Sequence, residues 1–293
     1  EALNLTDVEI LNAIKSSLKM QGNSETSIEP RTHIQPRAGV EGHFNVLRGW
    51  IGGGIDSAGT KVVGDFVDNY KDHRPSEYGI LTLFDPRTGA PKAIVDATGI
   101  TDKRTGAMTA LGAQDLAPSN PKILAHIGSR GTAYWNVRLL CSLFNFAEVR
   151  IHSKRKESRE AFAKKLEVDL KRKIIVTENW QDCIKGADIV VEASRLLKPE
   201  ALFKTSWIKK GSLVIPYGTM SAVERNIGPD STIALDFALN RLKNILKNMN
   251  VYPKKMLENL NITKGLIFSQ EVMLELTKSG LSREQSYKMV QSY

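Results

Sequence analysis

From residue 122 onward, short apolar runs alternate with longer segments of helical periodicity. The runs are rich in the aliphatic residues typical of strands buried on both faces, and they cover residues 122–128, 148–153, 173–177, 188–193 and 212–217. Between most of them, apolar residues recur every three or four positions. Strands that alternate with helices form parallel sheets. The pattern predicts an α/β fold with a Rossmann-type, doubly wound parallel sheet.

The first 115 residues follow a different pattern, in which strands succeed one another. The expected elements are a helix at 5–20, strands at 43–51 and 59–67, a hairpin at 78–96 that turns at 85–89, and a helix at 101–116. Thr6 with Glu9 three residues later forms a capping box at the start of the first helix. These residues predict an α+β unit with a mostly antiparallel sheet.

The last part of the chain reads as three or four amphipathic helices. Pro229 suits a first helical turn, and Ser282 with Gln285 suits the start of the last helix. A helical stripe is formed by Leu235, Leu239, Leu242 and Ile245. The chain is therefore expected to divide into an α+β domain at 1–115, an α/β domain at 116–220 and a helical segment at 221–293.

The first strand of the α/β pattern ends at a glycine turn. The sequence from Gly128 to Ala133 approaches the dinucleotide fingerprint G-x-G-x-x-G/A, with Arg130 in place of the second glycine. In such turns, glycines let the backbone approach a pyrophosphate at a helix N-terminus. Cofactor contacts are expected from Gly128, Arg130, Gly131, Thr132 and Ala133.

The end of the second strand indicates which coenzyme is bound. An Asp or Glu there accepts a hydrogen bond from the ribose 2′-hydroxyl of NAD. Here the strand is followed by Ser153, Lys154 and Arg155, with no acid, and these side chains suit a 2′-phosphate. The sequence favours NADP over NAD and leaves NAD possible.

Composition narrows the class of protein. The 293 residues include 41% hydrophobic and 25% charged residues, as in ordinary soluble globular proteins. The net charge of +9 is dispersed; its densest cluster, from Lys154 to Lys165, suits a solvated helix face more than a nucleic-acid site. No apolar run approaches the roughly 20 residues that span a membrane. Cys141 and Cys183 are expected to be buried structural thiols, and a cytoplasmic location is expected.

Several segments together resemble the ornithine cyclodeaminase/mu-crystallin family, over about residues 5–224. They are Gly59-Thr-Lys-Val-Val, Leu83-Phe-Asp-Pro-Arg-Thr-Gly-Ala-Pro, Ile100-Thr-Asp-Lys-Arg-Thr-Gly-Ala-Met-Thr-Ala, the turn at Gly128, and Gly186-Ala-Asp-Ile-Val-Val-Glu-Ala. The resemblance implies a nicotinamide cofactor, a small amino or imino acid as ligand, and a homodimer. It also implies that residues 1–115 form a substrate-binding and dimerisation domain and that residues 116–220 bind the dinucleotide. The activities it implies are those of cyclodeaminases, alanine-type dehydrogenases and ketimine reductases, with a non-catalytic, crystallin-like binding protein as the alternative.

The resemblance also implies roles for individual residues. Arg104 matches the arginine that pairs with the substrate carboxylate, Lys61 matches the lysine beside the substrate nitrogen, and Arg31 matches a further carboxylate contact. The residues implied to line the cofactor crevice are Asn69, Thr105, Ser194 and Gly218. His126, inside a strand, is expected to be a packed core histidine.

The chain departs from the family's pattern after Glu224. The family continues with a strand that ends in a catalytic aspartate, and this strand is not found; Asp236 lies in a helical pattern instead. From about Ser221 the chain resembles the C-terminal helices of adenylosuccinate lyases. The serine loop and catalytic histidine of those lyases have no counterpart, so the expected chemistry is hydride transfer at the α-carbon of an amino or imino acid.

Overall fold

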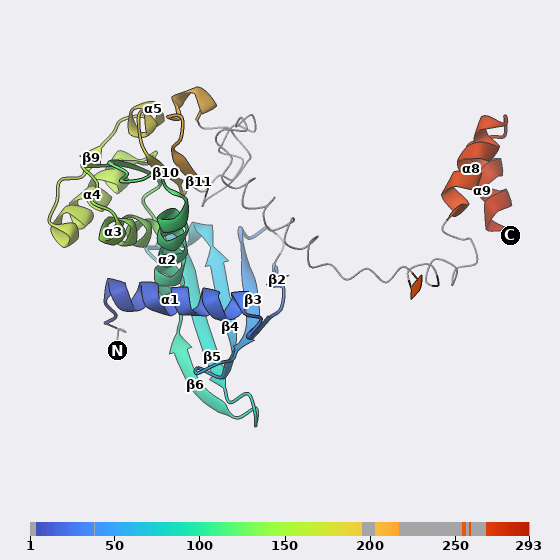
Figure 1. Ribbon diagram of the computed structural model, residues 1–293, viewed down its shortest axis with the longest axis horizontal. Coiled ribbons are helices and arrows are strands. Elements are labelled where there is room, and N and C mark those ends of the chain that lie inside the picture. The colour runs from blue at the N-terminus through green and yellow to red at the C-terminus, as the bar shows by residue number, and fades with distance from the viewer. Residues whose placement is uncertain are drawn as a thin grey trace. The chain divides into compact units, whose positions relative to one another are not determined.

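The computed structural model describes residues 4–37, 39–194, 203–216, 254–255, 258 and 268–292. The chain divides into two compact units, Glu1–Ile233 and Ala234–Tyr293. Both sheets belong to the first unit (Figure 1). The expected start of the helical segment at residue 221, the stripe from Leu235 to Ile245, Asp236 and Gly218 all lie outside the described residues.

The first sheet is antiparallel throughout, as expected. Its six strands run in the order β1-β3-β4-β5-β6, with β2 also on β3. Their bounds are β1 Thr26–Ile28, β2 Thr32–Ile34, β3 Gly42–Ile51, β4 Ser57–Phe66, β5 Glu77–Phe84 and β6 Pro91–Asp96. The predicted hairpin is confirmed as β5 and β6. A short 3₁₀ helix, Val67–Asp72, follows β4.

Helix α1 spans Asp7–Gly22 and begins at the predicted capping box. The backbone N–H of Thr6 donates to Glu9 Oε2 at 2.8 Å, and the N–H of Glu9 donates to Thr6 Oγ1 at 3.3 Å. Helix α2 spans Thr98–Leu116 and crosses helix α3, Ala133–Leu143, so closely that a Cβ on Gly106 would lie 2.7 Å from the backbone of Trp135. A glycine at 106 therefore lets these two helices touch.

The second sheet is parallel, with strand order β11-β10-β7-β8-β9. The strands are β7 Ile123–Ile127, β8 Glu148–His152, β9 Ile175–Val176, β10 Ile189–Glu192 and β11 Leu213–Pro216. The helices are α3 Ala133–Leu143, α4 Lys156–Leu170 and α5 Trp180–Ile184, with a 3₁₀ turn at Thr205–Trp207. After β7, the chain adds β8 and β9 on one side of β7. It then crosses to the other side of β7 and adds β10 and β11. This reversal places a topological switch point between β7 and β10, where α/β proteins bind ligands at the carboxyl ends of strands.

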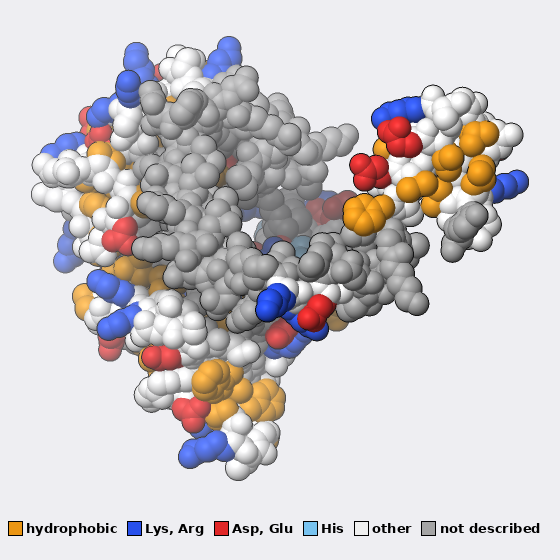
Figure 2. All heavy atoms as spheres, turned by 45° about the vertical axis from the view of Figure 1, so that its right-hand side comes forward, with side chains coloured by type: hydrophobic (Ala, Val, Ile, Leu, Met, Phe, Trp, Pro, Cys, Tyr) orange, Lys and Arg blue, Asp and Glu red, His pale blue; other side chains and the backbone are white. Residues whose placement is uncertain are grey.

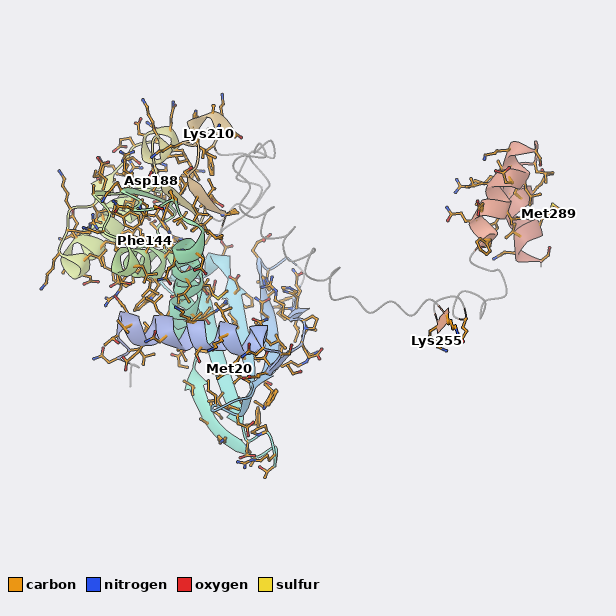
Figure 3. All side chains as sticks on the ribbon, viewed as in Figure 1. Met20, Phe144, Asp188, Lys210, Lys255 and Met289 are labelled. Carbon is orange, nitrogen blue, oxygen red and sulfur yellow. The ribbon has the colours of Figure 1, made fainter. Side chains whose placement is uncertain are left out.

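Successive side chains of β7 point to opposite faces of this sheet and pack in a hydrophobic core on each face. Leu124 packs in a core that includes residues of α1, α2, α3 and α4, whereas Ala125 and Ile127 pack with Cys183 of α5 and with Phe203. The doubly wound prediction is thereby confirmed. At the amino ends of the strands, Asp188 (labelled in Figure 3) accepts the N–H groups of Lys122 and Ile123 at 2.7 and 3.0 Å. One carboxylate thus ties the starts of β7 and β10 together.

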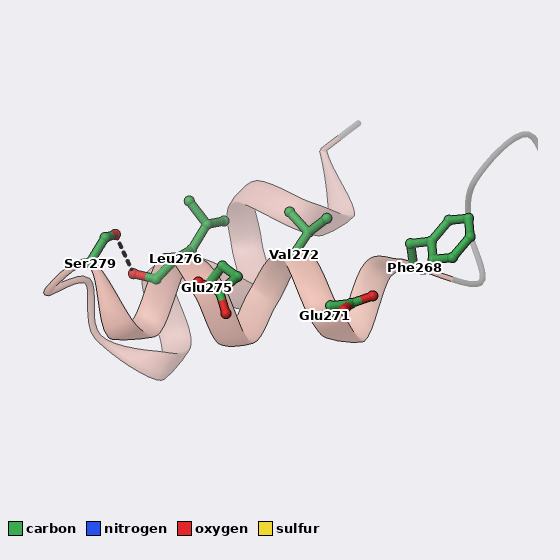
Figure 4. Close-up of a pocket in the computed structure, with 6 residues that line it drawn as sticks. All are labelled: Phe268, Glu271, Val272, Glu275, Leu276 and Ser279. Carbon is green, nitrogen blue, oxygen red and sulfur yellow. Dashed lines mark hydrogen bonds between the residues drawn. The ribbon is translucent and has the colours of Figure 1, made fainter.

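The second unit is described at helices α8, Ser269–Lys278, and α9, Arg283–Gln291. The predicted start of the last helix is confirmed, because Gln285 N donates to Ser282 Oγ at 3.2 Å and Ser282 N donates to Gln285 Oε1 at 3.0 Å. Along α8, Phe268, Val272 and Leu276 line an open hollow together with Glu271, Glu275 and Ser279 (Figure 4). None of the described helices is long and apolar enough to cross a membrane.

Candidate active site

A cavity of about 170 Å³ brings the expected substrate residues together. Arg31 reaches it from the connection between β1 and β2, Lys61 from β4 and Arg104 from α2. Thr132, from the glycine turn that follows β7, also lines it. The other lining residues are Asn45, Leu47, Val63, Asp65, Glu77, Thr101 and Thr105. The cavity therefore joins the antiparallel sheet to the carboxyl edge of the parallel one.

Strand alternation explains why Lys61 faces the cavity. In β4, residues 61, 63 and 65 share one face of the sheet, and all three line the cavity. Val62 points to the opposite face, where it is 38% exposed. The register places Lys61 between Leu47 on β3 and Leu81 on β5, so an ammonium group extends from an otherwise apolar row.

The surroundings of Lys61 alter its acidity. Burial, together with the nearby charge of Arg104, lowers the pKa of Lys61 to about 8, and Glu77 opposes part of this shift. Its Nζ donates to Thr101 Oγ1 at 3.2 Å. A lysine with a pKa near 8 is mostly charged at pH 7 but also has a neutral fraction. It can therefore both donate and accept a proton, as a general acid–base does.

The glycine turn is a close backbone turn between β7 and α3. Gly128 has φ +105°, and a Cβ there would lie 2.5 Å from the carbonyl oxygen of Ala193 after β10. Gly131 also has positive φ, at +55°. Helix α3 begins one residue after Thr132, and no side-chain oxygen of that residue caps it. A close backbone turn at an uncapped helix N-terminus fits a pyrophosphate.

His126 is a packed core residue, as predicted. It is fully buried, its Nδ1 lies 3.0 Å from the carbonyl oxygen of Gly128, and its Nε2 lies 3.4 Å from Asn136 Nδ2. Burial lowers the pKa of His126 to about 4. The neutral ring can accept from Asn136 and donate to the Gly128 carbonyl, so it holds the turn in place.

The family model that matches residues 1–235 describes the ornithine cyclodeaminase/mu-crystallin family. The chain belongs to this family. The nodulation efficiency protein NfeD of Rhizobium meliloti is 32% identical over 214 residues, which are 73% of this chain and 65% of NfeD. The chain thus spans about two thirds of that relative.

Solved structures of other proteins show the same fold. The Δ1-pyrroline-2-carboxylate reductase of Thermococcus litoralis, solved with NADH and L-proline, has a TM-score of 0.67 at 23% identity. The likeness covers 72% of this chain and 64% of the reductase. This agreement confirms the Rossmann-type fold that the hydrophobic pattern predicted.

A separate match concerns another protein. The adenylosuccinate lyase of Helicobacter pylori is 58% identical over 71 residues, which are 24% of this chain and 16% of the lyase. This length agrees with that of residues 221–293, which resemble the C-terminal helices of such lyases. Because 16% of the lyase is matched, the likeness is partial.

The residues expected to select the coenzyme, Ser153 to Arg155, directly follow β8. Ser129 of the glycine turn donates its hydroxyl to Ser153 Oγ at 3.0 Å, so turn and strand end are linked. Lys154 and Arg155 are exposed. Arg159 departs from the expected solvated face: it is 5% exposed, pairs with Glu178 and donates to the carbonyl of Ser153 at 3.2 Å.

The other expected site residues lie in different surroundings. Asn69 does not line the cavity; its Nδ2 donates to the carbonyl of Pro75 at 2.9 Å. Thr105 lines the cavity, and its hydroxyl donates to the carbonyl of Thr101 at 2.7 Å.

Of the two cysteines, Cys183 is buried as expected, whereas Cys141 is only partly buried. Arg130 and Gly131 are exposed on the turn, and Ala133 is buried.

Sequence reasoning missed Glu192, which ends β10 at the switch point. It is fully buried, and its Oε1 accepts both the backbone N–H of Ser194, at 2.7 Å, and the Ser194 hydroxyl. Its Oε2 has no hydrogen-bond partner among the described residues. Burial raises the pKa of Glu192, with Ser194 opposing the shift. An acid within the last strand residues of an α/β sheet was the available signal.

Glu192→Gln is expected to become more stable relative to the native chain as pH rises. A carboxyl whose folded pKa is raised contributes stability below its unfolded pKa and loses it as pH rises through the folded pKa. Glutamine does not ionise, so above that pKa it should exceed the native chain by about 1–3 kcal/mol. Urea unfolding from pH 5 to 9 measures this. The exposed Glu157→Gln is the control, and a difference that does not vary with pH would contradict the expectation.

Proposed function

We propose that this chain is an NAD(P)-dependent enzyme that transfers a hydride at the α-carbon of a small amino or imino acid. The observation that supports it is the single cavity shared by Arg31, Lys61, Arg104 and Thr132. Two guanidinium groups suit an α-carboxylate, which they can bind through paired hydrogen bonds. Thr132 connects that carboxylate site to the glycine turn.

Each residue has a distinct role in this proposal. Arg104 and Arg31 hold the substrate carboxylate, which fixes the orientation of the α-carbon. Lys61 exchanges a proton with the substrate nitrogen, as its lowered pKa permits. The coenzyme supplies or accepts the hydride when it is bound. The reductase that shares this fold was solved with NADH and L-proline, which supports a small cyclic amino or imino acid as ligand class.

The proposed coenzyme contacts follow the crevice. Gly128, Gly131, Thr132 and Ala133 would hold the pyrophosphate at the start of α3, with Arg130 beside it. Ser153, Lys154 and Arg155 would hold a 2′-phosphate, so we propose NADP in preference to NAD. Ser194 and Thr105, with Gly218 and Asn69, are proposed for the nicotinamide half.

Arg155→Glu is expected to weaken NADPH binding tenfold or more, about 1.4 kcal/mol, and to leave NADH binding nearly unchanged. The charge reversal places a carboxylate where the 2′-phosphate would lie. Fluorescence titration with each coenzyme measures both constants. Lys164→Glu, an equal charge reversal at an exposed position of α4, is the control. Equal weakening of both coenzymes would contradict the assigned phosphate contact.

Turnover separates the enzyme from the alternative, a non-catalytic ligand-binding protein. The test measures NADPH oxidation with Δ1-pyrroline-2-carboxylate and a panel of acyclic imino acids. Substrate-dependent oxidation that Lys61→Met abolishes supports the enzyme. Saturable NADPH binding without turnover of any panel member would instead establish the binding protein.

The antiparallel sheet also supports a homodimer. Its face opposite the cavity carries exposed apolar residues in register, among them Ile80, 57% exposed, beside Val62, and Ile94, 76% exposed, beside Thr82. Figure 2 shows exposed hydrophobic side chains at the lower end of this sheet. Exposed large apolar side chains that are neighbours on one sheet face are typical of a protein–protein interface.

Ile80→Asp is expected to convert the dimer to monomer. A carboxylate on this face would be buried in the dimer without an ion-pair partner. The free-energy cost of removing it from water should prevent dimerisation. Sedimentation velocity at several protein concentrations measures the change. Ile28→Asp is the control, because Ile28 is also exposed but lies on the other face by register. Native chain that sediments as a monomer would exclude the dimer.

A further inference from the structure

The contact that orients Lys61 comes from α2. Thr101 is 8% exposed, lines the cavity and accepts a hydrogen bond from Lys61 Nζ at 3.2 Å across 40 residues of sequence. The same hydroxyl donates to the carbonyl of Ala97 at 2.8 Å. Both contacts involve the single oxygen of a threonine side chain whose helix position is fixed.

The chemistry of a hydroxyl gives this contact a direction. A threonine hydroxyl has one proton, and here the Ala97 carbonyl receives it. Toward Lys61 the oxygen can therefore act only as an acceptor. In this contact Lys61 therefore presents an N–H to Thr101, in the charged and in the neutral amine. The remaining Nζ positions, including the lone pair of the neutral amine, must lie away from Thr101.

We propose that Thr101 is a positioning residue that presents the reactive Nζ position of Lys61 to the ligand in the cavity. Without this acceptor, the four-carbon side chain has several rotamers and no defined direction for its lone pair. The charged groups around the same cavity are Arg31, Asp65, Glu77 and Arg104. The inference rests on the proposed function, because it assigns a geometry to the proton transfer proposed there.

Removal of the hydroxyl separates positioning from a change in acidity. Thr101→Val keeps the side-chain volume but removes the acceptor that favours the charged amine, so the pKa of Lys61 should fall below about 8. If the pKa of Lys61 were the only property that changed, more of the Lys61 amine would be neutral at pH 7. The variant would then deprotonate an amino acid more readily. Loss of positioning predicts the opposite, a fall in kcat.

The experiment combines turnover with labelling of Lys61. Competitive acylation at a series of pH values, read by mass spectrometry, reports the pKa of Lys61 without turnover. For Thr101→Val we expect a lower Lys61 pKa and a kcat for amino-acid oxidation at least tenfold lower, with KM and the NADPH Kd within threefold. Thr101→Ser should restore both values. Thr109→Val, at another buried threonine of α2, is the control for packing.

The outcomes are distinguishable. An unchanged Lys61 pKa together with an unchanged kcat in Thr101→Val would overturn the proposal. A higher kcat would also overturn it, because acidity would then dominate. If the native chain has no turnover but its Lys61 pKa responds to Thr101→Val and recovers in Thr101→Ser, the hydrogen bond is supported and the proposed function fails. If Thr101→Val does not fold, as shown by its melting curve, Thr101→Ala serves the same comparisons.

Discussion

Lys61→Met is expected to lower kcat by about 10²–10⁴-fold, the range of a lost general acid–base. Methionine matches the length of the lysine stem and fits the row between Leu47 and Leu81, so the sheet should remain intact. NADPH affinity is expected to stay within threefold, because the substitution removes a proton-transfer group and not a coenzyme contact. Steady-state kinetics with the best substrate of the panel, together with fluorescence titration, measure both quantities.

The pH dependence supplies a second measurement at the same residue. In the reductive direction Lys61 must carry a proton, so kcat/KM of the native chain should fall as pH rises through about 8. In the oxidative direction the neutral amine is needed, and the rate should rise over the same range. Lys61→Arg should be as inactive as Lys61→Met, because arginine does not release its proton in this range.

Two results would contradict this role for Lys61. One is Lys61→Met with kcat within threefold of the native chain. The other is an unaltered pH profile in that variant. Lys92→Met, on the exposed edge of β6, is the matched control for loss of a strand lysine.

Gly128→Ala is expected to abolish coenzyme binding and to destabilise the fold. An alanine at φ +105° is strained, and its Cβ would lie 2.5 Å from the carbonyl oxygen of Ala193. Both neighbours are backbone that follows central strands, so neither can move without disturbing β7 or β10. Backbone strain of this kind costs about 1–3 kcal/mol. The displaced turn should raise the Kd for NADPH at least 100-fold.

Titration and thermal melting test this expectation. The melting temperature should fall by several degrees, at roughly 2–4 °C for each kcal/mol in a unit of this size. Gly112→Ala is the control: it lies in α2 with no atom within 4 Å of an added Cβ, and should stabilise the helix by about 0.5–1 kcal/mol. Unchanged NADPH binding in Gly128→Ala would exclude the turn as the pyrophosphate site.

Local patterns were sufficient to predict most described elements. The capping box at Thr6, the hairpin of β5 and β6, and the five parallel strands all follow from residue spacing within a few positions. The predicted helix at 101–116 begins earlier, at Thr98, because Asp96 Oδ1 accepts the N–H of Thr98 at 2.8 Å and the chain has already turned there. That turn depends on a side-chain contact, which hydrophobic periodicity does not report.

The candidate site was predicted in part. The family resemblance identified Arg31, Lys61 and Arg104, and the structure brings all three to one cavity although 73 positions separate the first from the last. The resemblance also suggested Asn69, which bonds to the carbonyl of Pro75 and does not line this cavity. For Glu192, the acid at the end of an apolar strand was a local signal of a site, but its burial depends on the neighbouring strands, which a local pattern does not report.

The strands, the helices, the sheet class and the glycine turn can be predicted from local sequence. The periodicities of strand and helix and the conformational freedom of glycine act over a few neighbouring residues. The tertiary structure decided which groups act on one another. The Lys61 pKa near 8 depends on Arg104 and on burial, and its orientation depends on Thr101, 40 residues away. Electrostatic and hydrogen-bond effects depend on distance through space, and only the folded chain sets those distances.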